Sequence, residues 1–374
     1  MEQEYQVCTN CVMDTSDEKI SFSNEGICNH CLTFENIQKN QIYTGDLADK
    51  LLKEQINKIK AAGKGREYDC IIGLSGGVDS SYVAYKVKKL GLRPLAVHVD
   101  SGWNSELAVC NIESIVRILD IDLITHVVDW PEMQDLQLSF FKASVPNCDI
   151  PQDHAFMAIL YRTAAKYGIR YVISGHNAAT ESILPASWGY SALDAKHLTY
   201  IQKIFGSKKL RKYPTFGIFQ YAFYWPYVKG IRNFRILNYM DYQKEEVKKF
   251  IIDKIDWRDY GGKHHESLFT KFFQSYYLPH KFGFDKRKAH LSSLIVSGQM
   301  TREEALQELN KPAYDSTTIE DDKLYVAKKL GVGLKAFNEI LERPQKRHQD
   351  YPSNEKIMSL LLKIKETIRR KLTK

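Results

Sequence analysis

Between residues 69 and 237, short apolar runs alternate with longer stretches in which apolar residues recur at helical spacing. The apolar runs lie at residues 69–74, 93–100, 122–129, 170–174 and 234–237. Short runs of this kind are typical of strands buried on both faces, and strands that alternate with helices form parallel sheets. The pattern therefore predicts an α/β fold built on a doubly wound, parallel five-stranded sheet.

The same pattern indicates how the chain is divided. A helical stretch at residues 47–62 leads into the first strand, and the chain after residue 260 has mostly helical spacing. In that region Thr301 and Glu304 have the spacing of a capping box. We expect an N-terminal module at residues 1–45, the sheet domain at 46–260, and a mostly helical substrate or partner region at 261–374.

Composition and charge narrow the class of protein only slightly. The 374 residues are 44% hydrophobic and 26% charged, which is ordinary for a globular protein and excludes a wholly disordered chain. The net charge of +8 favours anionic partners without selecting among them.

The start of the chain carries no apolar leader, and the uncharged stretch 213–228 is short and broken by Pro and Gly. We predict a cytoplasmic protein with no transmembrane segment.

Four of the seven cysteines lie close together near the N-terminus and form the pattern C-x2-C-x16-C-x2-C: Cys8, Cys11, Cys28 and Cys31. Two such pairs supply a tetrahedral set of four thiolates, for which Zn2+ is the favoured ion in a reducing compartment. His30 offers a substitute ligand, and an iron–sulfur cluster is the alternative occupant. A four-thiolate shell has no open position, so we predict a structural zinc site that supplies much of the folding energy of its module.

A turn of small residues, from Ser75 to Ser80, joins the first strand to the first helix of the sheet domain. Its sequence is Ser-Gly-Gly-Val-Asp-Ser. Glycines let the backbone approach a ligand, and the N–H groups at the start of a helix face an anion. The turn lacks the Gly-Lys-[Ser/Thr] of a Walker A loop and the spacing of a dinucleotide-binding loop. It therefore predicts a phosphate-binding loop of another kind.

This turn resembles the signature of the PP-loop ATP pyrophosphatases, which have a sheet of the HUP type. The resemblance implies that ATP is cleaved between its α and β phosphates and that a substrate oxygen receives AMP. It also implies a set of ATP-binding residues in the turn: Ser75, Gly76, Gly77, Asp79 and Ser80.

Two further strand ends complete the predicted ATP site. Asp100 ends the second strand, where doubly wound folds contact the ribose or base, and the resemblance places the backbone of His98 and Val99 against adenine. After the fourth strand, the segment that begins Gly175-His176-Asn177 is similar to the second motif of the family. Asp79 and Glu181 are candidate Mg2+ ligands, the alternatives being a helix cap and a solvated side chain.

Several segments outside the ATP motifs identify a subfamily: residues 147–154, 183–190, 257–267, 269–271 and 284–292. With the cysteine module, they resemble the N-acetyl sugar amidotransferases of bacterial surface-polysaccharide and flagellin-glycan pathways. The resemblance implies ATP, Mg2+ and structural Zn2+ as cofactors and a nucleotide-linked acetamido sugar as substrate. The amide oxygen of the sugar attacks ATP to give an imidoyl adenylate, and ammonia then displaces AMP to leave an acetamidino group.

Catalysis of this kind depends on positioning and on cations at the phosphates. We assign Asp79, Lys263, His264 and Arg287 as catalytic residues, with Lys271 and Lys288 as further cationic candidates. Three other residues are candidates for substrate contacts: His154, Trp188 and His265. The histidines would orient the substrate or accept a proton, and Trp188 would stack on the sugar. A satisfied core or surface position is the alternative for each.

The chain shows no glutaminase signature, since none of Cys70, Cys110 and Cys148 lies in a nucleophile elbow. We therefore expect a separate glutaminase partner, with a barrel subunit as a plausible ammonia conduit, docking at residues 213–228.

Two other functions remain open. A tRNA thiolase or lysidine-synthase type enzyme would use the basic run Lys203, Lys208, Lys209, Arg211 and Lys212, although no nucleic acid partner is preferred. An ATP-sensing protein with a decayed site is the non-enzymatic alternative.

Overall fold

A computed structural model describes residues 4–261 and 267–361. Its single sheet has five parallel strands in the order β3-β2-β1-β4-β5. The bounds of the strands are β1 Cys70–Gly73, β2 Pro94–Asp100, β3 Asp122–Val127, β4 Tyr171–Ser174 and β5 Arg232–Arg235. The predicted fold class is confirmed. The third strand ends earlier than predicted, and the residues predicted as the end of the fifth strand instead form the 3-10 helix η2 (Ile236–Tyr239).

Helices cover both faces of the sheet. One face packs against α2 (Gly45–Gly63), α3 (Val78–Lys89), α4 (Glu106–Leu119) and α9 (Lys244–Ile255), and the other packs against α6 (Ile150–Lys166) and the π-helix η1 (Gln220–Val228). Neighbouring residues of β1 show the alternation, because Ile71 joins one core and Ile72 the other. A sheet buried on both faces explains why its strands are apolar throughout.

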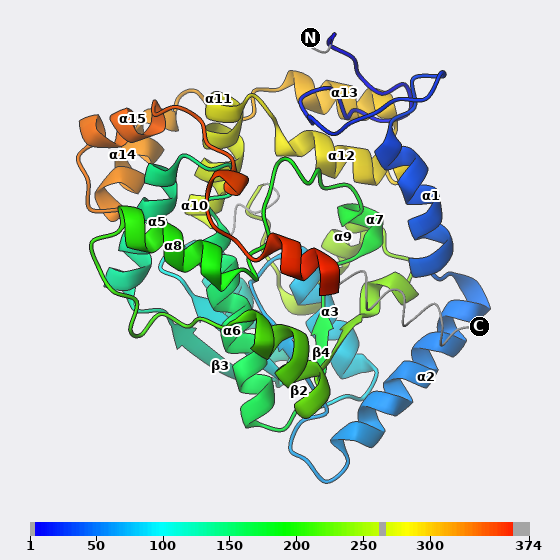
Figure 1. Cartoon of the computed structure of the whole chain (residues 1–374). Coiled ribbons are helices and arrows are strands. Elements are labelled where there is room, and N and C mark those ends of the chain that lie inside the picture. Colours follow the sequence, from blue (N-terminus) through cyan, green and yellow to red (C-terminus); the bar gives the residue numbers. More distant parts are fainter. Residues whose placement is uncertain (1–3, 262–266, 362–374) are drawn as a thin grey trace.

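The strand order fixes the place of the ligand edge. The chain moves from β1 to β2 and β3 on one side, and it then returns to the other side of β1 for β4 and β5. The switch point therefore lies between the carboxyl ends of β1 and β4. The turn after β1 and the loop after β4 both lie at this edge, which faces the C-terminal helices in Figure 1.

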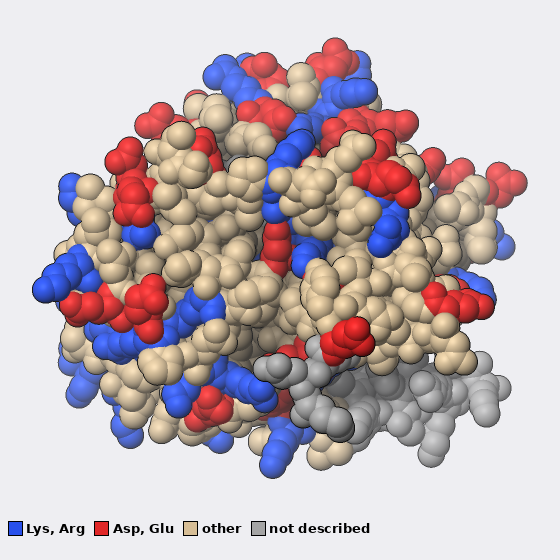
Figure 2. Space-filling view, turned by 90° about the horizontal axis from the view of Figure 1, so that it is seen from above, with Lys and Arg blue, Asp and Glu red and all other residues tan. Residues whose placement is uncertain are grey.

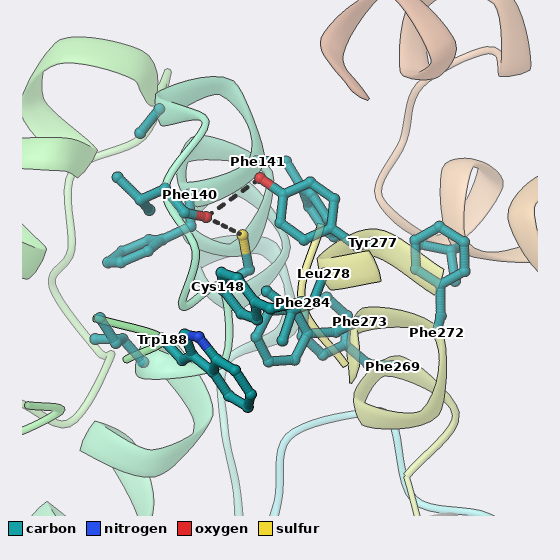
Figure 3. Packing of buried hydrophobic residues seen from close by; sticks show 14 of the residues in the cluster. Phe140, Phe141, Cys148, Trp188, Phe269, Phe272, Phe273, Tyr277, Leu278 and Phe284 are labelled. Atoms are coloured by element: carbon teal, nitrogen blue, oxygen red, sulfur yellow. Dashed lines mark hydrogen bonds between the residues drawn. The ribbon is translucent and has the colours of Figure 1, made fainter. Parts of the chain in front are cut away.

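A second layer lies above the sheet. Beside it, α13 (Arg302–Asn310) joins Val12 and Leu291 in a separate small cluster. The layer itself combines α5 (Trp130–Ala143) and α8 (Ala195–Phe205) with C-terminal elements: α10 (Leu268–Phe272), η3 (Phe273–Tyr277), α11 (Leu278–Phe282), α12 (Lys286–Val296), α14 (Ile319–Lys329) and α15 (Leu334–Leu341). Their aromatic side chains form one core, drawn in Figure 3. This core crosses the boundary predicted near residue 260, and the proposed division of the chain stays a prediction. Among the described residues, no helix has the length and apolar character required to cross a bilayer.

The N-terminal module rests on α12 and α13 at the top of Figure 1 and continues into α1 (Asn29–Gln41). The remaining short elements are α7 (Ala178–Glu181), directly after β4, and η4 (His348–Asp350). Because α1 leads from the cysteines to α2, it runs past the ligand edge of the sheet and contacts α7. The module is therefore joined to the sheet domain by packing as well as by the chain.

Candidate active site

The turn from Ser75 to Ser80 begins where β1 ends at the ligand edge. Gly76 has φ +80°, and a Cβ atom there would lie 2.5 Å from the carbonyl oxygen of Ala108 in α4. Only glycine fits both constraints. The Ser80 hydroxyl donates to the carbonyl of Gly77 at 3.1 Å and accepts from the N–H of Ser75 at 3.4 Å, which closes the turn over the start of α3. Ser75 itself is exposed, so the turn presents an open anion-binding surface at the N-terminus of α3.

Buried side chains from distant parts of the chain hold this turn from behind. The indole N–H of Trp257 donates to the carbonyl of Gly76 at 2.8 Å. Asn111 donates more weakly to the same carbonyl at 3.5 Å and exchanges two hydrogen bonds with the backbone of Arg258. Neither residue was identified from the sequence, although Trp257 opens a segment that was singled out for its composition.

Asp79 lies in the first turn of α3 and receives a hydrogen bond from the hydroxyl of Tyr242. Burial raises the pKa of Tyr242, and the nearby carboxylates of Asp79 and Glu181 raise it further. The tyrosine therefore stays a proton donor. Because both carboxylates act on the pKa of one hydroxyl, Asp79 and Glu181 lie near each other, although they come from different predicted ATP motifs.

The loop after β4 approaches the turn closely. A Cβ atom at Gly175 would lie 3.2 Å from the backbone carbon of Asp79, so the two motifs meet at the switch point as predicted. The ring of His176 pairs with the carboxylate of Glu181 at 2.5 Å. The fully buried Asn177 caps α7 through the N–H of Thr180 at 2.9 Å. The Asn177 side chain is therefore committed to its own helix, and the residue has no exposed surface.

The end of β2 is ordered by its own polar residues. His98 is buried and contacts the carbonyl of Leu74 at 3.0 Å through Nδ1 and the amide of Asn104 at 3.1 Å through Nε2. Asp100 accepts from the N–H of Gly102 at 2.8 Å and from Asn104 at 3.2 Å. Val99 and Asp100 are partly exposed beside the turn after β1. These contacts fix the strand end where the sequence placed the adenosine moiety.

The donor set at the switch point suits Mg2+. Asp79 and Glu181 offer carboxylate oxygens, the ligands that hard divalent cations prefer. Both side chains are partly exposed, and each already has a protein partner, Tyr242 and His176 respectively. The phosphates of ATP and water would complete the coordination, as is usual for Mg2+.

The four N-terminal cysteines form a compact cluster. Neighbouring sulfur atoms lie 3.7–3.9 Å apart, and one ligand atom from each residue lies within 4.8 Å of all the others. A tetrahedral ion with Zn–S bonds of about 2.3 Å requires sulfur separations of about 3.8 Å. Backbone N–H groups of Cys11, Met13 and Cys28 point at the sulfurs, as expected for thiolates. The set therefore fits Zn2+, whereas His30 pairs with Asp17 at 2.8 Å.

Contacts from the C-terminal region hold this module in place. Arg302 donates to the carbonyls of Cys8 and Cys11 at 3.1 and 3.0 Å. Lys288 forms an ion pair with the buried Asp14. Burial opposes ionisation of Asp14, but the contacts with Lys288 and Ser16 prevail and lower its pKa. Lys288, a cationic candidate for the phosphates, thus serves the cysteine module.

Other predicted catalytic residues have different positions. Arg287 pairs with Asp285 at 2.7 Å and donates to the carbonyl of Lys311 at 3.0 Å, so it joins the start of α12 to the end of α13. Its guanidinium is committed to this joint, which corrects its assignment to the phosphates. Lys271 pairs with Asp322 at 3.1 Å. Lys263, His264 and His265 lie outside the described residues.

Two residues assigned to the substrate lie in the core. His154 is fully buried, stacks on Phe216 and contacts the carbonyl of Ala192 and the hydroxyl of Thr215. Burial lowers its pKa to about 4. Trp188 is 1% exposed, stacks on Phe284 as Figure 3 shows, and donates to the carbonyl of Ser16. Neither ring has a face for a sugar, so the structural alternative replaces both assignments.

Comparison with known proteins gives one family match and a few relatives. Residues 266–365 match the family "LPS biosynthesis protein WbpG-like, C-terminal domain". An uncharacterized protein of Methanocaldococcus jannaschii is 23% identical over 318 residues, which cover 82% of this chain and 93% of that protein. A tRNA-specific 2-thiouridylase of Fusobacterium nucleatum, MnmA 2, is 29% identical over 136 residues, 34% of this chain and 37% of that protein.

Two solved structures are similar at low identity. The NH3-dependent NAD synthetase of Campylobacter jejuni is 18% identical with a TM-score of 0.30, over 42% of this chain and 72% of that one. An NMN synthetase of Francisella tularensis is 16% identical with a TM-score of 0.30, over 59% and 95% respectively. At these values the likeness carries no inference about activity.

Proposed function

We propose that the chain is an ATP-using enzyme of the PP-loop ATP pyrophosphatase type and that it acts as an N-acetyl sugar amidotransferase with a WbpG-like C-terminal domain. The observation that supports the proposal is the presence in one chain of an intact PP-loop at the switch point and a region of the lipopolysaccharide biosynthesis type. The product would be an acetamidino sugar for a surface polysaccharide such as an O-antigen.

The proposed reaction has two steps. The acetamido oxygen attacks the α phosphorus of ATP, which forms the O–P bond of an imidoyl adenylate and releases pyrophosphate. Ammonia then attacks the imidoyl carbon, the C–O bond breaks, and AMP leaves with the former amide oxygen. The net change consumes ATP, ammonia and the acetamido sugar and yields AMP, pyrophosphate and the acetamidino sugar.

The residues of the chain act on this reaction mainly by position. The N–H groups at the start of α3 would bind the departing pyrophosphate, aided by the helix dipole. The edge of β2 at Val99 and Asp100 would hold the adenosine moiety. Asp79 and Glu181 would hold Mg2+, which neutralises charge on the phosphate oxygens. Lys263 and His264 are retained as proposed phosphate-binding and proton-accepting residues, and His265 as a proposed substrate contact.

The ammonia would come from a separate glutaminase, with a barrel subunit as its conduit. Burial raises the pKa of the Cys70 and Cys148 thiols, which disfavours the thiolate that a glutaminase requires. Cys110 is exposed on α4. For docking of the partner we propose η1 and its N-terminal flank, where the exposed rings of Phe219, Phe223 and Tyr227 follow one another at 5.3 and 5.9 Å.

A tRNA-modifying activity is the second candidate, favoured by the 29% identity to the 2-thiouridylase over 136 residues. The charges facing the viewer in Figure 2 are of both signs and interspersed, whereas tRNA binding favours a basic stripe. AMP formation that requires tRNA and does not occur with acetamido sugars would decide for this candidate.

The experiment that tests the proposal measures AMP release with ammonium salts and a panel of UDP- and CMP-linked N-acetyl sugars. We expect one sugar to support AMP and pyrophosphate formation in equal amounts, with loss of both in Asp79→Ala. Glutamine should substitute for ammonium only when the partner glutaminase is added. AMP release without any dependence on an acetamido sugar would contradict the proposal.

A further inference from the structure

A short segment after β5 contacts both ATP motifs at once. It comprises Ile236 to Tyr242 and begins with η2. At one end, the side-chain oxygen of Asn238 accepts the N–H of Ala178, the first residue of α7, at 2.9 Å. At the other end, the hydroxyl of Tyr242 donates to the carboxylate of Asp79 in α3. Two residues of one segment, four positions apart, thus contact the two loops that meet at the switch point.

We propose that Asn238 and Tyr242 are positioning residues that hold the two ATP motifs in register, Tyr242 by orienting Asp79 and Asn238 by anchoring α7. The proposal rests on the ATP-binding part of the proposed function and does not depend on the identity of the acceptor. Neither residue touches the reacting atoms, and both act through residues that would bind MgATP.

The surroundings of Tyr242 favour donation of its hydroxyl hydrogen to a carboxylate. The residue is 3% exposed, its ring lies 6.0 Å from that of Tyr82 in α3, and burial together with the charges of Asp79 and Glu181 raises its pKa. A buried hydroxyl requires a partner, and a charged acceptor gives a stronger bond than a neutral one. The bond fixes one oxygen of Asp79, and so it sets the direction in which the carboxylate as a whole can face a cation.

Asn238 performs the corresponding task for the second motif. The residue is 6% exposed, and its backbone carbonyl accepts the N–H of Tyr43 at 2.9 Å while its side chain accepts the N–H of Ala178. The first N–H groups of a helix have no partner within the helix and need an external acceptor. Because α7 has only four residues, its placement, and that of Glu181 at its end, depends strongly on such anchors.

Packing alone does not fix the outer side of this segment. A cavity of about 190 Å3 lies against it, lined among others by Asn238, Met240, Tyr242, Phe34 of α1 and Ala179 of α7. On its inner side, the buried Ile236 anchors the start of the segment in the core of the sheet, and the buried Leu237 lies between that core and the cavity. Gln299 also holds the segment through the carbonyl of Tyr242 at 3.0 Å, and the hydrogen bonds to Asp79 and Ala178 are the side-chain bonds that join it to the two motifs.

The test is the dissociation constant for MgATP measured by calorimetry without an acceptor. Tyr242→Phe removes only the hydroxyl, and we expect the dissociation constant to rise about tenfold or more, as for loss of a hydrogen bond to a charged group. Tyr314→Phe is the matched control, because that hydroxyl also donates to an aspartate, Asp322, at 2.6 Å. The control should lose comparable stability and keep the wild-type dissociation constant. An unchanged dissociation constant in Tyr242→Phe would overturn the proposal for Tyr242.

A double-mutant cycle separates positioning from a general structural effect. If Tyr242 acts through Asp79, the Tyr242→Phe change has no further effect on MgATP binding in an Asp79→Ala background. An effect of equal size in both backgrounds would overturn the proposal. Asn238→Leu should weaken MgATP binding although Tyr242 is intact. A cooperative thermal unfolding transition shows that this variant is folded. Unchanged MgATP binding would overturn the assignment of Asn238.

The outcome is distinguishable from failure of the proposed function. If the wild type binds MgATP but forms no AMP with any acetamido sugar, the amidotransferase proposal fails, and the effects of Tyr242→Phe and Asn238→Leu on binding still decide the positioning roles. If the wild type does not bind MgATP, the ATP site itself and this proposal are both overturned.

Discussion

Tyr242 donates a hydrogen bond to the carboxylate of Asp79 although 163 positions separate the two residues in the sequence. The contact joins the segment after the last strand to the turn after the first strand. It shows that the turn proposed to bind ATP is not a self-contained loop. Its carboxylate is held by Tyr242 and its glycine carbonyl by Trp257, both from later parts of the chain. Substitution of Tyr242 or Trp257 should therefore weaken ATP binding at this turn.

Replacement of Gly76 by alanine should disable the turn. The residue has φ +80°, and the added Cβ would approach the carbonyl oxygen of Ala108 to 2.5 Å. We expect a stability loss of about 1–3 kcal/mol and MgATP binding weakened by more than tenfold. Gly333→Ala is the matched control, because that glycine has φ −71° and no atom within 4 Å of the added carbon. Wild-type MgATP binding in Gly76→Ala would contradict the role of the turn.

Removal of the metal should unfold the N-terminal module and destabilise the whole chain. The purified protein should contain one zinc ion per chain by elemental analysis, and chelation or Cys11→Ser should lower the free energy of unfolding by at least about 4 kcal/mol. The control is Cys110→Ser, which changes an exposed thiol outside the cluster. Retention of zinc and of full stability in Cys11→Ser would show that the four cysteines do not form the site.

Lys288→Ala should reduce stability without affecting the nucleotide. The substitution leaves Asp14, which is 1% exposed, buried without its cation, at a cost of about 3 kcal/mol. Chemical denaturation should show this loss, while the dissociation constant for MgATP stays at the wild-type value. Lys335→Ala, on the exposed side of α15, provides the control. A large fall in MgATP affinity would instead restore Lys288 to the phosphates.

Stability should fall as the pH drops from about 6.5 towards 4. Burial lowers the pKa of His154 and His197 to about 4 and that of His348 well below its usual value. The unfolded chain therefore binds more protons than the folded chain in this range, and acid favours unfolding. Asp153 opposes the trend, because burial and the charge of Asp149 raise its pKa to about 7.

Urea denaturation at pH 7 and pH 5 measures this dependence. Three histidines outweigh one aspartate, and we expect the free energy of unfolding to be lower at pH 5 by on the order of 2–3 kcal/mol. In His197→Gln the difference should be smaller, because one of the neutral buried rings is removed. Equal stability at the two pH values in the wild type would contradict the assignment of neutral buried histidines.

Much of the fold was accessible from the sequence because its signals are local. Apolar runs located the five strands, the small-residue turn located the loop at the start of α3, and the paired cysteines located the cluster of four sulfurs. The end of the fifth strand was wrong because Ile236 and Leu237 are apolar for a different reason. Both are buried in a 3-10 turn that leaves the sheet, and periodicity over four residues does not distinguish these cases.

Interactions between distant parts of the chain leave no local pattern in the sequence from which they could be predicted. Tyr242, Trp257 and Asn238 act at the ATP motifs through single hydrogen bonds, which leave no trace in local spacing. The converse error affected Arg287 and Lys288. A cation in a sequence gives no indication whether it pairs with a phosphate or with a carboxylate of its own chain, and both residues pair with aspartates.

The most direct test of the amidotransferase mechanism follows one oxygen atom. The acetamido oxygen of the sugar is labelled with oxygen-18, the reaction is run with ATP and ammonium, and the products are analysed by mass spectrometry. The account predicts that the label appears in AMP, that pyrophosphate is unlabelled, and that the sugar has exchanged its amide oxygen for NH. Unlabelled AMP, or formation of ADP and phosphate in place of AMP and pyrophosphate, would contradict it.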